Sequence, residues 1–482
     1  MPSPQTRSWV AQAGGSLKDE GHGITSLSDG SAIVTGSFQG TASFGENITL
    51  TSTGEDDIFI AKLNADSSYA WATKAGGRSF DGAYGITSLS DENGISDGSA
   101  IVTGLFAGTA DFGDITLTSE GRSDAFIAKL NADGSFAWVT QAGGGNERYR
   151  KSASGFDISS LNDGSSIVTG RFEGTADFGD ITLTSAGNHA SDVFIAKLNA
   201  DGSFAWASQA GGDDWENSNG ITSLSDGSAI VTGQFRGTAD FGDITLTSAG
   251  DHDIFIAKLD ANGDYIWATQ AGGSSSDNGY GITSLSDGSA IVTGQFRGTA
   301  DFGDITLTDP GYNQSEVFIA KLNADGSFAW VTQAGGGSSD TGYGITSLSD
   351  GSAIITGSHG GGGSSFGDIN LTATTLGVND IFVAKLNAEG EFEWATQAGG
   401  LTIESGHGIT SLSDGSSIIT GHFGRRWDSE VETASFGDIT LTPAGHPNVN
   451  RLSDVFIAKL NADGSWASTE MVDSSAPVFS SG

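Results

Sequence analysis

Acidic side chains recur at one position of this 482-residue sequence, directly before an apolar run of the type Asp-Ile-Phe-Ile-Ala-Lys-Leu. The members are Asp57, Asp124, Asp192, Asp253, Glu316, Asp380 and Asp454. Carboxylate oxygens are hard ligands that suit calcium, so the six aspartates are candidate calcium ligands. None of them fits the spaced acidic loop of an EF-hand. The alternative is that each aspartate caps a turn by accepting backbone N–H bonds.

Repetition also bears on whether these acids could be catalytic. A reaction centre needs one asymmetric set of unlike groups. Acids that recur in every copy of a repeat suit structure or multivalent binding instead. We therefore predict no catalytic residue among them.

Histidines break the repetition and are the second source of chemistry. His22 and His407 precede equivalent strands, and His422 and His359 lie where two other strands end. If the first and last repeats are neighbours, a site of two or three histidines could form at their seam and bind a ligand or a metal. The alternative is that these histidines are scattered surface or packing residues.

Two further segments combine aromatic and charged residues outside the repeat pattern. Trp215 lies in the variable segment Asp213–Asn217, and Arg425, Arg426 and Trp427 lie together in an insertion. Stacking, cationic and acidic groups in one loop favour ligand or partner contact. The alternative for both is a surface loop without a ligand.

These residues belong to one sequence unit that is repeated seven times. Each copy ends in a tryptophan followed by a segment related to Gln-Ala-Gly-Gly. The tryptophans are Trp9, Trp71, Trp138, Trp206, Trp267, Trp330 and Trp394, spaced 61 to 68 residues apart. A fixed period of this length indicates stacked or radial units that cannot bury their own faces alone.

The unit reads as β-structure throughout. Short β-branched and aromatic runs are bounded by Asp-Gly and Gly-Gly turns, and Ser-Asp-Gly-Ser and Asn-Ala-Asp-Gly-Ser are hairpin signals. We predict four antiparallel strands, A to D, in each unit. The run before each Lys-Leu is apolar on both of its alternating faces, as expected of a sheet buried between two others.

The sequence therefore predicts one all-β domain, a seven-bladed β-propeller with four-stranded antiparallel blades. Blades should start near residues 22, 85, 155, 220, 281, 344 and 408. A β-solenoid is the alternative architecture. Residues 469–482 read as a C-terminal tail.

Ring closure can be predicted from the phase of the repeat. After Asn461 the last copy lacks strand D, and Trp466 takes the place of a phenylalanine. The missing strand stands at the other end of the chain, in residues 1–15. We expect this N-terminal strand to complete blade 7 and remove exposed sheet edges.

The repeats resemble the bacterial SBBP-type β-propeller repeat. In the fourth copy the matching segments are Ile221 to Gly233 and Asp253 to Lys258, with equivalents in every copy. The resemblance implies a propeller fold and a secreted or cell-surface place in bacteria. The N-terminus has no apolar segment of the signal-peptide type.

Net charge narrows the classes of partner. Fifty-nine acidic and 21 basic residues give a net charge of −38, which excludes a nucleic-acid backbone as partner. An anionic membrane surface would repel the chain, and no membrane insertion is expected. The absence of cysteine excludes disulfides, zinc–thiolate sites and a thiol nucleophile.

The long B–C connections and the variable D–A loops should share one face of the propeller, and binding usually lies on such variable loops. The sequence favours a non-catalytic binding scaffold with a multivalent surface for a glycan, a surface polymer or a partner protein. One alternative is a hydrolase or lyase with a site at the channel mouth in repeats 6, 7 and 1. Another is a structural component of an extracellular matrix or sheath.

Overall fold

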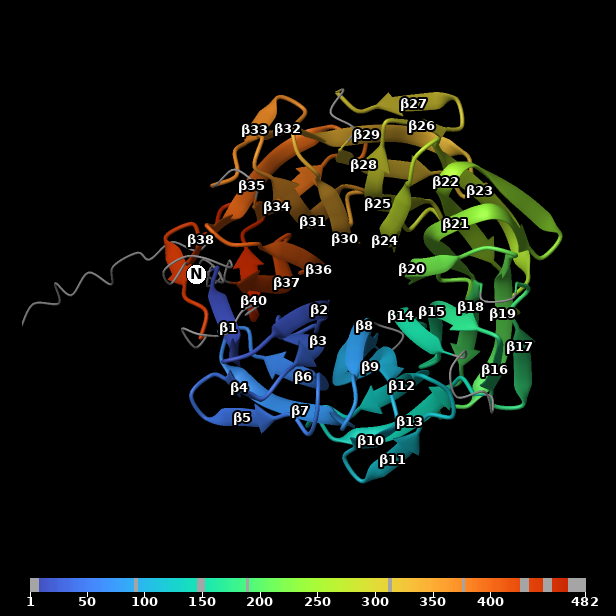
Figure 1. Cartoon of the computed structure of the whole chain (residues 1–482). Helices are drawn as coiled ribbons and strands as arrows, with labels where there is room; N and C mark the ends of the chain where they lie inside the picture. Colours follow the sequence, from blue (N-terminus) through green and yellow to red (C-terminus); the bar gives the residue numbers. More distant parts are fainter. Residues whose placement is uncertain are drawn as a thin grey trace, which may run out of the picture.

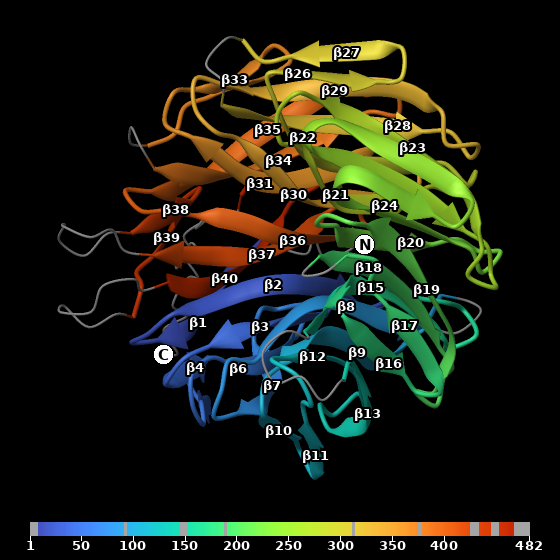
Figure 2. The same ribbon diagram turned by 45° about the vertical axis from the view of Figure 1, so that its right-hand side comes forward.

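The computed structural model describes residues 8–90, 94–144, 152–187, 190–310, 314–374, 378–424, 433–444 and 453–466. These residues form antiparallel β-sheets arranged around a central opening, so the fold is a β-propeller (Figure 1). The turned view shows the sheets following one another side by side (Figure 2). Within the described residues, no helix has the length and apolar character needed to cross a membrane.

The strands that border the central opening come first in each repeat (Figure 1). They are β2 (Asp19–Ser26), β8 (Gly82–Ser90), β14 (Ala153–Ser160), β20 (Asn217–Ser223), β24 (Asn278–Ser284), β30 (Thr341–Ser347) and β36 (Ser405–Ser411). We call them the inner strands and number the repeats after them, from repeat 1 at β2 to repeat 7 at β36.

Each inner strand pairs with a second strand of its repeat. The second strands are β3 (Ala32–Phe38), β9 (Ser96–Phe106), β15 (Ser166–Glu173), β21 (Ala229–Phe241), β25 (Ala290–Arg297), β31 (Ala353–Gly360) and β37 (Ser417–Gly424). The third strands are β6 (Asp57–Leu63), β12 (Asp124–Leu130), β18 (Ser191–Leu198), β22 (Ile244–Leu259), β28 (Ser315–Leu322), β34 (Asn379–Leu386) and β40 (Ser453–Leu460).

A fourth strand follows the third on the outer side of the sheet. In repeats 1 to 6 these are β7 (Tyr69–Gly77), β13 (Phe136–Ala142), β19 (Phe204–Gly212), β23 (Tyr265–Gly273), β29 (Phe328–Gly336) and β35 (Phe392–Gly400). In repeat 7 the strand next to β40 is β1 (Val10–Gly15), from the other end of the described chain.

Each unit has more strands than the four predicted, because the connection between strands B and C itself forms a two-stranded hairpin. The hairpin pairs are β4 (Thr41–Phe44) with β5 (Ile48–Thr51), β10 (Thr109–Phe112) with β11 (Ile115–Thr118), β16 (Thr175–Phe178) with β17 (Ile181–Thr184), β26 (Thr299–Phe302) with β27 (Ile305–Thr308), β32 (Ser364–Phe366) with β33 (Ile369–Leu371), and β38 (Ala434–Phe436) with β39 (Ile439–Leu441). In repeat 4 the outer parts of β21 and β22 form the same hairpin.

The hairpin forms because its sequence alternates. In β10, Ala110 and Phe112 are buried while Thr109 and Asp111 are exposed. Gly113 takes a φ of +63° at the turn, a conformation that glycine adopts without steric cost. The hairpin lies on the fourth strand of the preceding repeat, where Ala110 faces Gly77. Each repeat thus extends the sheet of the one before it.

The inner strands begin earlier than the predicted blade starts. They start at residues 19, 82, 153, 217, 278, 341 and 405, two or three residues before the predicted positions. The reason is a register shift inside each inner strand, such as that between Gly21 and Gly23 of β2. The strand pairs on both sides of this β-bulge, so the Gly-X-Gly segment does not end it.

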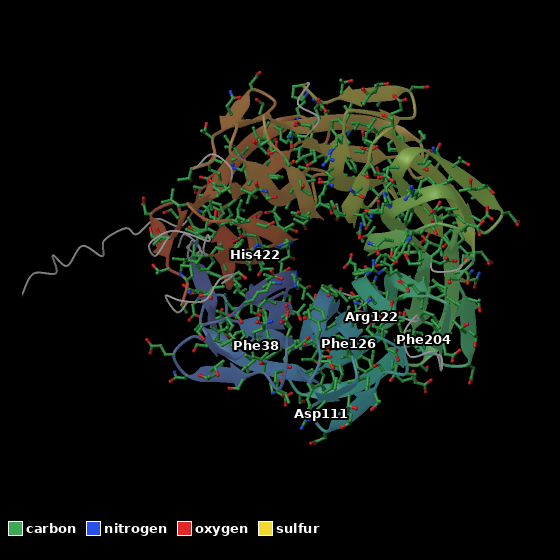
Figure 3. The ribbon with its side chains drawn as sticks, viewed as in Figure 1. Phe38, Asp111, Arg122, Phe126, Phe204 and His422 are labelled. Atoms are coloured by element: carbon green, nitrogen blue, oxygen red, sulfur yellow. The ribbon has the colours of Figure 1, made fainter. Side chains whose placement is uncertain are left out.

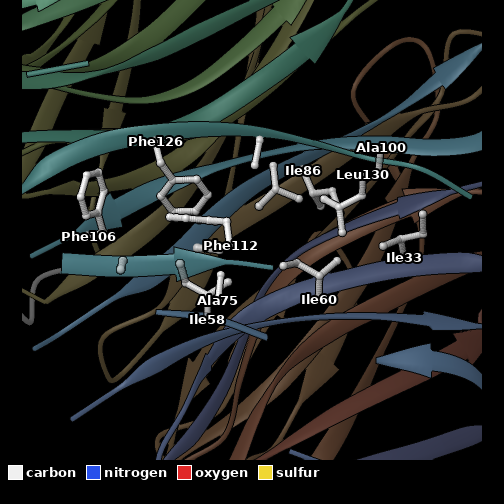
Figure 4. Packing of buried hydrophobic residues seen from close by; sticks show 14 of the residues in the cluster. Ile33, Ile58, Ile60, Ala75, Ile86, Ala100, Phe106, Phe112, Phe126 and Leu130 are labelled. Atoms are coloured by element: carbon white, nitrogen blue, oxygen red, sulfur yellow. The ribbon is translucent and has the colours of Figure 1, made fainter. Parts of the chain in front are cut away.

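Apolar residues fill the space between neighbouring sheets. One cluster joins Ile33, Ile58 and Ile60 of repeat 1 to Phe112 and Phe126 of repeat 2 (Figure 4). Both faces of the third strands are buried, as the sequence predicts for sheets enclosed by other sheets.

The repeated tryptophans link one repeat to the next. The Trp71 indole N–H donates to the carbonyl of Ala132 in the following repeat at 3.0 Å. Gly134, at φ +84°, lies against the Trp71 ring, where a Cβ would come within 2.7 Å. Trp9, Trp138, Trp206, Trp267 and Trp330 make the equivalent hydrogen bond.

Candidate functional site

The bulge in each inner strand places one unpaired residue beside the channel. These residues, which we call the channel ring, are His22, Tyr84, Phe156, Asn219, Tyr280, Tyr343 and His407. A β-bulge re-aims a side chain without ending the strand. The channel ring lines a cavity of about 190 Å³ together with its sequence neighbours.

Close approach of the inner strands explains the glycine that follows each ring residue. A Cβ on Gly281 would lie 2.6 Å from the Tyr343 carbonyl oxygen of the next repeat. Gly23, Gly220, Gly344 and Gly408 meet the next ring residue in the same way. Repeat 3 is the exception, since Asp157 stands where the other repeats have glycine.

Aromatic contacts connect most of the channel ring. Ring centroids lie 5.3 Å apart for Tyr280 and Tyr343, 5.1 Å for Tyr343 and His407, and 5.8 Å for His407 and His22. The series continues to Tyr84 at 5.3 Å and from Tyr84 to Phe156 at 5.7 Å. The remaining member, Asn219, donates from its amide to the Gly279 carbonyl at 2.7 Å.

The structure brings three of the predicted site histidines together. His407 Nε2 and His422 Nδ1 lie 3.2 Å apart, and their rings stack at 26°. His22 contacts His407, and its Nε2 lies 4.0 Å from Glu20 Oε2, which pairs with Lys18 at 2.8 Å. His422 lies beside the central opening (Figure 3). The predicted seam between the first and last repeats therefore holds a histidine cluster.

Burial keeps these histidines neutral. Burial lowers the pKa of His22 to about 4, and burial together with the His422 and His22 charges lowers the pKa of His407 well below its usual value. The pKa of His422 is also lowered by burial. Neutral imidazoles can accept protons or donate one hydrogen bond each. Within the described residues, however, no group of three or more His, Cys, Asp or Glu side chains could hold a metal ion.

His359 does not join the cluster. Its side chain is fully buried in β31, opposite Asp380 in the ladder, and neither ring nitrogen has a hydrogen-bond partner. Burial lowers the pKa of His359 to about 4. It is a packing residue at a position that other repeats fill with phenylalanine.

Exposed apolar side chains gather on the D–A loops. Phe80, Trp215 and Ile403 each stand directly before the acid that ends this loop, and they are 38%, 47% and 57% exposed. Leu401, in the same loop as Ile403, is 47% exposed. Because these side chains lie in loops of different repeats, they form no single patch, but a ligand that spans several repeats could contact more than one of them.

A pocket of about 240 Å³ lies beside Trp215. Arg171, Gln234, Arg236 and His252 line it with the tryptophan. Arg236 Nε also lies 3.5 Å from Asp251 Oδ1. An indole with two guanidinium groups can stack on a sugar or aromatic ring and bind an anionic group. Arg425, Arg426 and Trp427, the other predicted ligand contacts, lie outside the described residues.

The candidate calcium ligands are separated from one another, since each belongs to a different repeat. Their side chains are buried, and in most of them one carboxylate oxygen accepts a backbone N–H, as Asp253 does from Ala249 at 2.9 Å. These bonds match the turn-capping alternative. The other oxygen is buried without a partner in Asp57, Asp124, Asp253, Asp380 and Asp454, and Glu316 also has one such oxygen.

A second buried acid faces several of these residues from the next D–A loop. Asp19 Oδ2 and Asp454 Oδ1 both approach within 3.0 Å of the position that a Cβ on Gly14 would occupy. Asp277 with Asp253 and Asp81 with Asp57 repeat this arrangement. Burial, together with the Asp454 charge, raises the pKa of Asp19 to about 8. Calcium binding at the predicted aspartates stays a prediction.

No protein-family model and no curated protein matches the chain. Among solved structures it is similar to the WD40 domain of Pan2 from Neurospora crassa, with 8% identity, a TM-score of 0.43, and coverage of 86% of this chain and 93% of that one. YCF48 bound to a D1 peptide shares 9% identity at a TM-score of 0.41, covering 87% of this chain and 96% of that one. A protein of unknown function from Bacteroides caccae shares 11% identity at a TM-score of 0.35, covering 71% of this chain and 89% of that one. Similarities at this level carry no argument about function.

The channel ring is the feature that sequence reasoning missed. Its signal was a glycine on one or both sides of the ring residue inside a predicted strand, as in Gly279-Tyr280-Gly281. Glycine inside a strand often marks a bulge or a close backbone approach. The pattern was instead interpreted as the start of the strand, which left tyrosines at this position unassigned.

Proposed function

We propose that the protein is a non-catalytic binding scaffold whose ligand surface lies on the face of the D–A loops. The ligand would be a glycan, a surface polymer or a partner protein. The proposal includes a secreted or cell-surface location.

One observation carries the proposal. The large apolar side chains that are exposed within the described residues are Phe80, Ile95, Trp215, Ile266, Leu401 and Ile403. Four of these six lie on D–A loops, and three of the four share one position of the repeat. Contacts at several repeats would add through avidity if one ligand spans them.

The pocket beside Trp215 gives this surface its most specific chemistry. A stacking indole and the guanidinium groups of Arg171 and Arg236 favour a sugar or an aromatic group that bears a negative charge. In a chain with a net charge of −38, two guanidinium groups border this pocket, where Glu216 also lines it and Asp251 lies 3.5 Å from Arg236.

A glycan array probed with the wild-type protein and with Trp215→Ala tests the proposal. We expect binding to acidic glycans or surface polymers that Trp215→Ala reduces about tenfold or more, as for an interface hot spot. Ile266→Ala is the matched control, because Ile266 is 53% exposed but belongs to β23 rather than a D–A loop. Equal loss in both variants, or no loss in either, would argue against this face.

We also propose that the ring has seven blades, that β1 closes it, and that the repeats are of the SBBP type. In support, β1 lies between β40 and β4, with Val10 opposite Ala458 and Ala13 opposite Phe44. The hydroxyl of Thr410 in β36 donates to Ser26 in β2 at 3.0 Å, as Thr222 does to Ser284 between other inner strands. Deleting residues 1–15 should lower the melting temperature and cause self-association. A truncated protein that melts as before and stays monomeric would contradict closure.

A hydrolase or lyase is the second candidate function, and the histidine cluster favours it. Neutral His407 and His422 in contact beside Glu20 are groups of the kind that transfer protons in general acid–base catalysis. Burial would raise the pKa of Glu20, but the nearby His422 and the hydrogen bond and charge of Lys18 outweigh it and hold the pKa below its usual value. Turnover of a polysaccharide panel that His407→Ala with His422→Ala abolishes would support this candidate.

A further inference from the structure

The channel contains a carboxylate at one point where the other repeats allow no side chain. Asp157 lines the channel cavity and stands in the glycine position of the repeat. Its two oxygens accept the backbone N–H groups of Ile158 and Ile221, each at 2.9 Å. Within the described residues Asp157 takes part in no ion pair.

Asp157 is partly buried, and a carboxylate withdrawn from water without a counter-ion loses solvation that two backbone hydrogen bonds replace only in part. Burial raises the pKa of Asp157 to about 7, despite the two backbone hydrogen bonds that favour its charged form. A cation in the channel would remove this cost. The carboxylate is thus a feature that the fold does not need, since glycine serves in the same place in the other repeats.

Aromatic rings line the same cavity as Asp157. Phe156 contacts Tyr84, Tyr280 contacts Tyr343, and all four border the cavity. The hydroxyls of Tyr84 and Tyr280 stay protonated, because burial raises the pKa of each to about 12. The faces of neutral aromatic rings attract cations.

One residue of the channel ring already contacts a cationic side chain of the protein itself. The Arg171 guanidinium carbon lies 5.6 Å from the centroid of the Phe156 ring. This separation is within the range of cation–π contacts. A second cation near the ring in the described part of the chain, Lys18, is paired with Glu20 at 2.8 Å. The cluster histidines are neutral, so they do not repel a positive ligand.

We propose that the channel binds an organic cation, an ammonium or guanidinium group on a short aliphatic stem, with the tyrosines as its cage and Asp157 as its counter-charge. The cavity of about 190 Å³ has room for such a group, since a protein cavity of about 150 Å³ holds a benzene molecule. A small free amine and a Lys or Arg side chain of a partner protein share this chemistry. The site lies in the channel rather than on the D–A loops, and Arg171 borders both the channel ring and the Trp215 pocket.

Isothermal titration of the full-length protein with choline tests the proposal. Its neutral carbon isostere, 3,3-dimethyl-1-butanol, measures the contribution of the charge. We expect choline to bind about tenfold or more tightly than the isostere. Asp157→Asn and Tyr280→Leu should each weaken choline binding by a similar factor. A peptide with one central lysine, compared with its alanine analogue, then distinguishes a partner's side chain from a free amine.

Asp111→Asn is the matched control, because it makes the same chemical change on the outer hairpin, far from the channel (Figure 3). It should leave choline binding unchanged. Melting temperatures show whether the variants fold. If Asp157→Asn does not fold, Tyr280→Leu still tests the site. Equal affinity for choline and the isostere, or unchanged choline affinity in Asp157→Asn, would overturn the proposal. The outcome is independent of the glycan test, which uses Trp215.

Discussion

His359 is a residue at which the repeat departs from its own packing pattern. The equivalent side chains Phe38, Phe106, Phe172, Phe235, Phe296 and Phe423 are fully buried, as is His359. Its two ring nitrogens lack hydrogen-bond partners, and such buried polar atoms destabilise a folded protein. We expect His359→Phe to raise the free energy of unfolding by about 1–3 kcal/mol, measured by urea denaturation. A loss of stability would mean that the imidazole has a role that its contacts do not reveal.

The sequence predicted whether a single side chain is exposed better than it predicted which side chains lie next to one another. Trp215 was singled out because it breaks the repeat, and it is exposed in a loop. The contact between His22, His407 and His422 was expected only on the assumption that the first and last repeats meet. The channel ring could not be predicted, since a one-residue bulge depends on pairing with the neighbouring strand. The acid that faces Asp253 was also missed, because Asp277 lies in the next loop rather than beside it in sequence.

The outer hairpin is the element that the sequence did not reveal. Phe112 anchors it, with ring centroids 5.0 Å from Phe126 and 5.6 Å from Phe136. We expect Phe112→Ala to cost about 3–5 kcal/mol of stability, as for a large buried aromatic residue. Thermal and urea unfolding measure the loss. Asp114→Asn, at the exposed turn of the same hairpin, should leave stability almost unchanged.

The four main strands could be predicted because their turn residues and alternation are strong local signals. The hairpin was hidden by its composition, since Thr-Ala-Asp-Phe-Gly-Asp carries three turn formers and only two strand formers. Its strands are short and are held by the preceding repeat, as Ala110 is by Gly77. Local propensity does not report a partner of this kind.

For the whole molecule, buried acids should make stability depend on pH. Burial raises the pKa of Asp81 and Asp277 to about 7 and of Glu216 to about 8. In the unfolded chain these pKa values lie near 4. The stability that these groups contribute is therefore complete below about pH 4 and is lost as pH rises through about 7–8.

The aspartates of the Ser-Asp-Gly-Ser turns change stability with pH in the opposite direction. Hydrogen bonds from Ser228 and Ser289 lower the pKa of Asp226 and Asp287, so their contribution is present above the unfolded value and is lost as pH falls through the folded one. Together the two sets place maximal stability near pH 4. Urea midpoints measured from pH 4 to pH 9 should fall between about pH 4 and pH 8 and change little above that. A midpoint that rises steadily toward pH 8 would contradict the buried acid pairs.

The central claim is that the D–A loops form one multivalent binding surface. Its most direct test compares the wild-type protein with the triple variant Phe80→Ser, Trp215→Ser, Ile403→Ser, using whichever polymer the wild type binds and a short fragment of that polymer. By biolayer interferometry, the wild type should bind the polymer about tenfold or more tightly than the fragment, through avidity. The triple variant should lose this advantage while melting as the wild type does, and Ile266→Ser should keep it. A triple variant that retains the full affinity for the polymer would contradict the account.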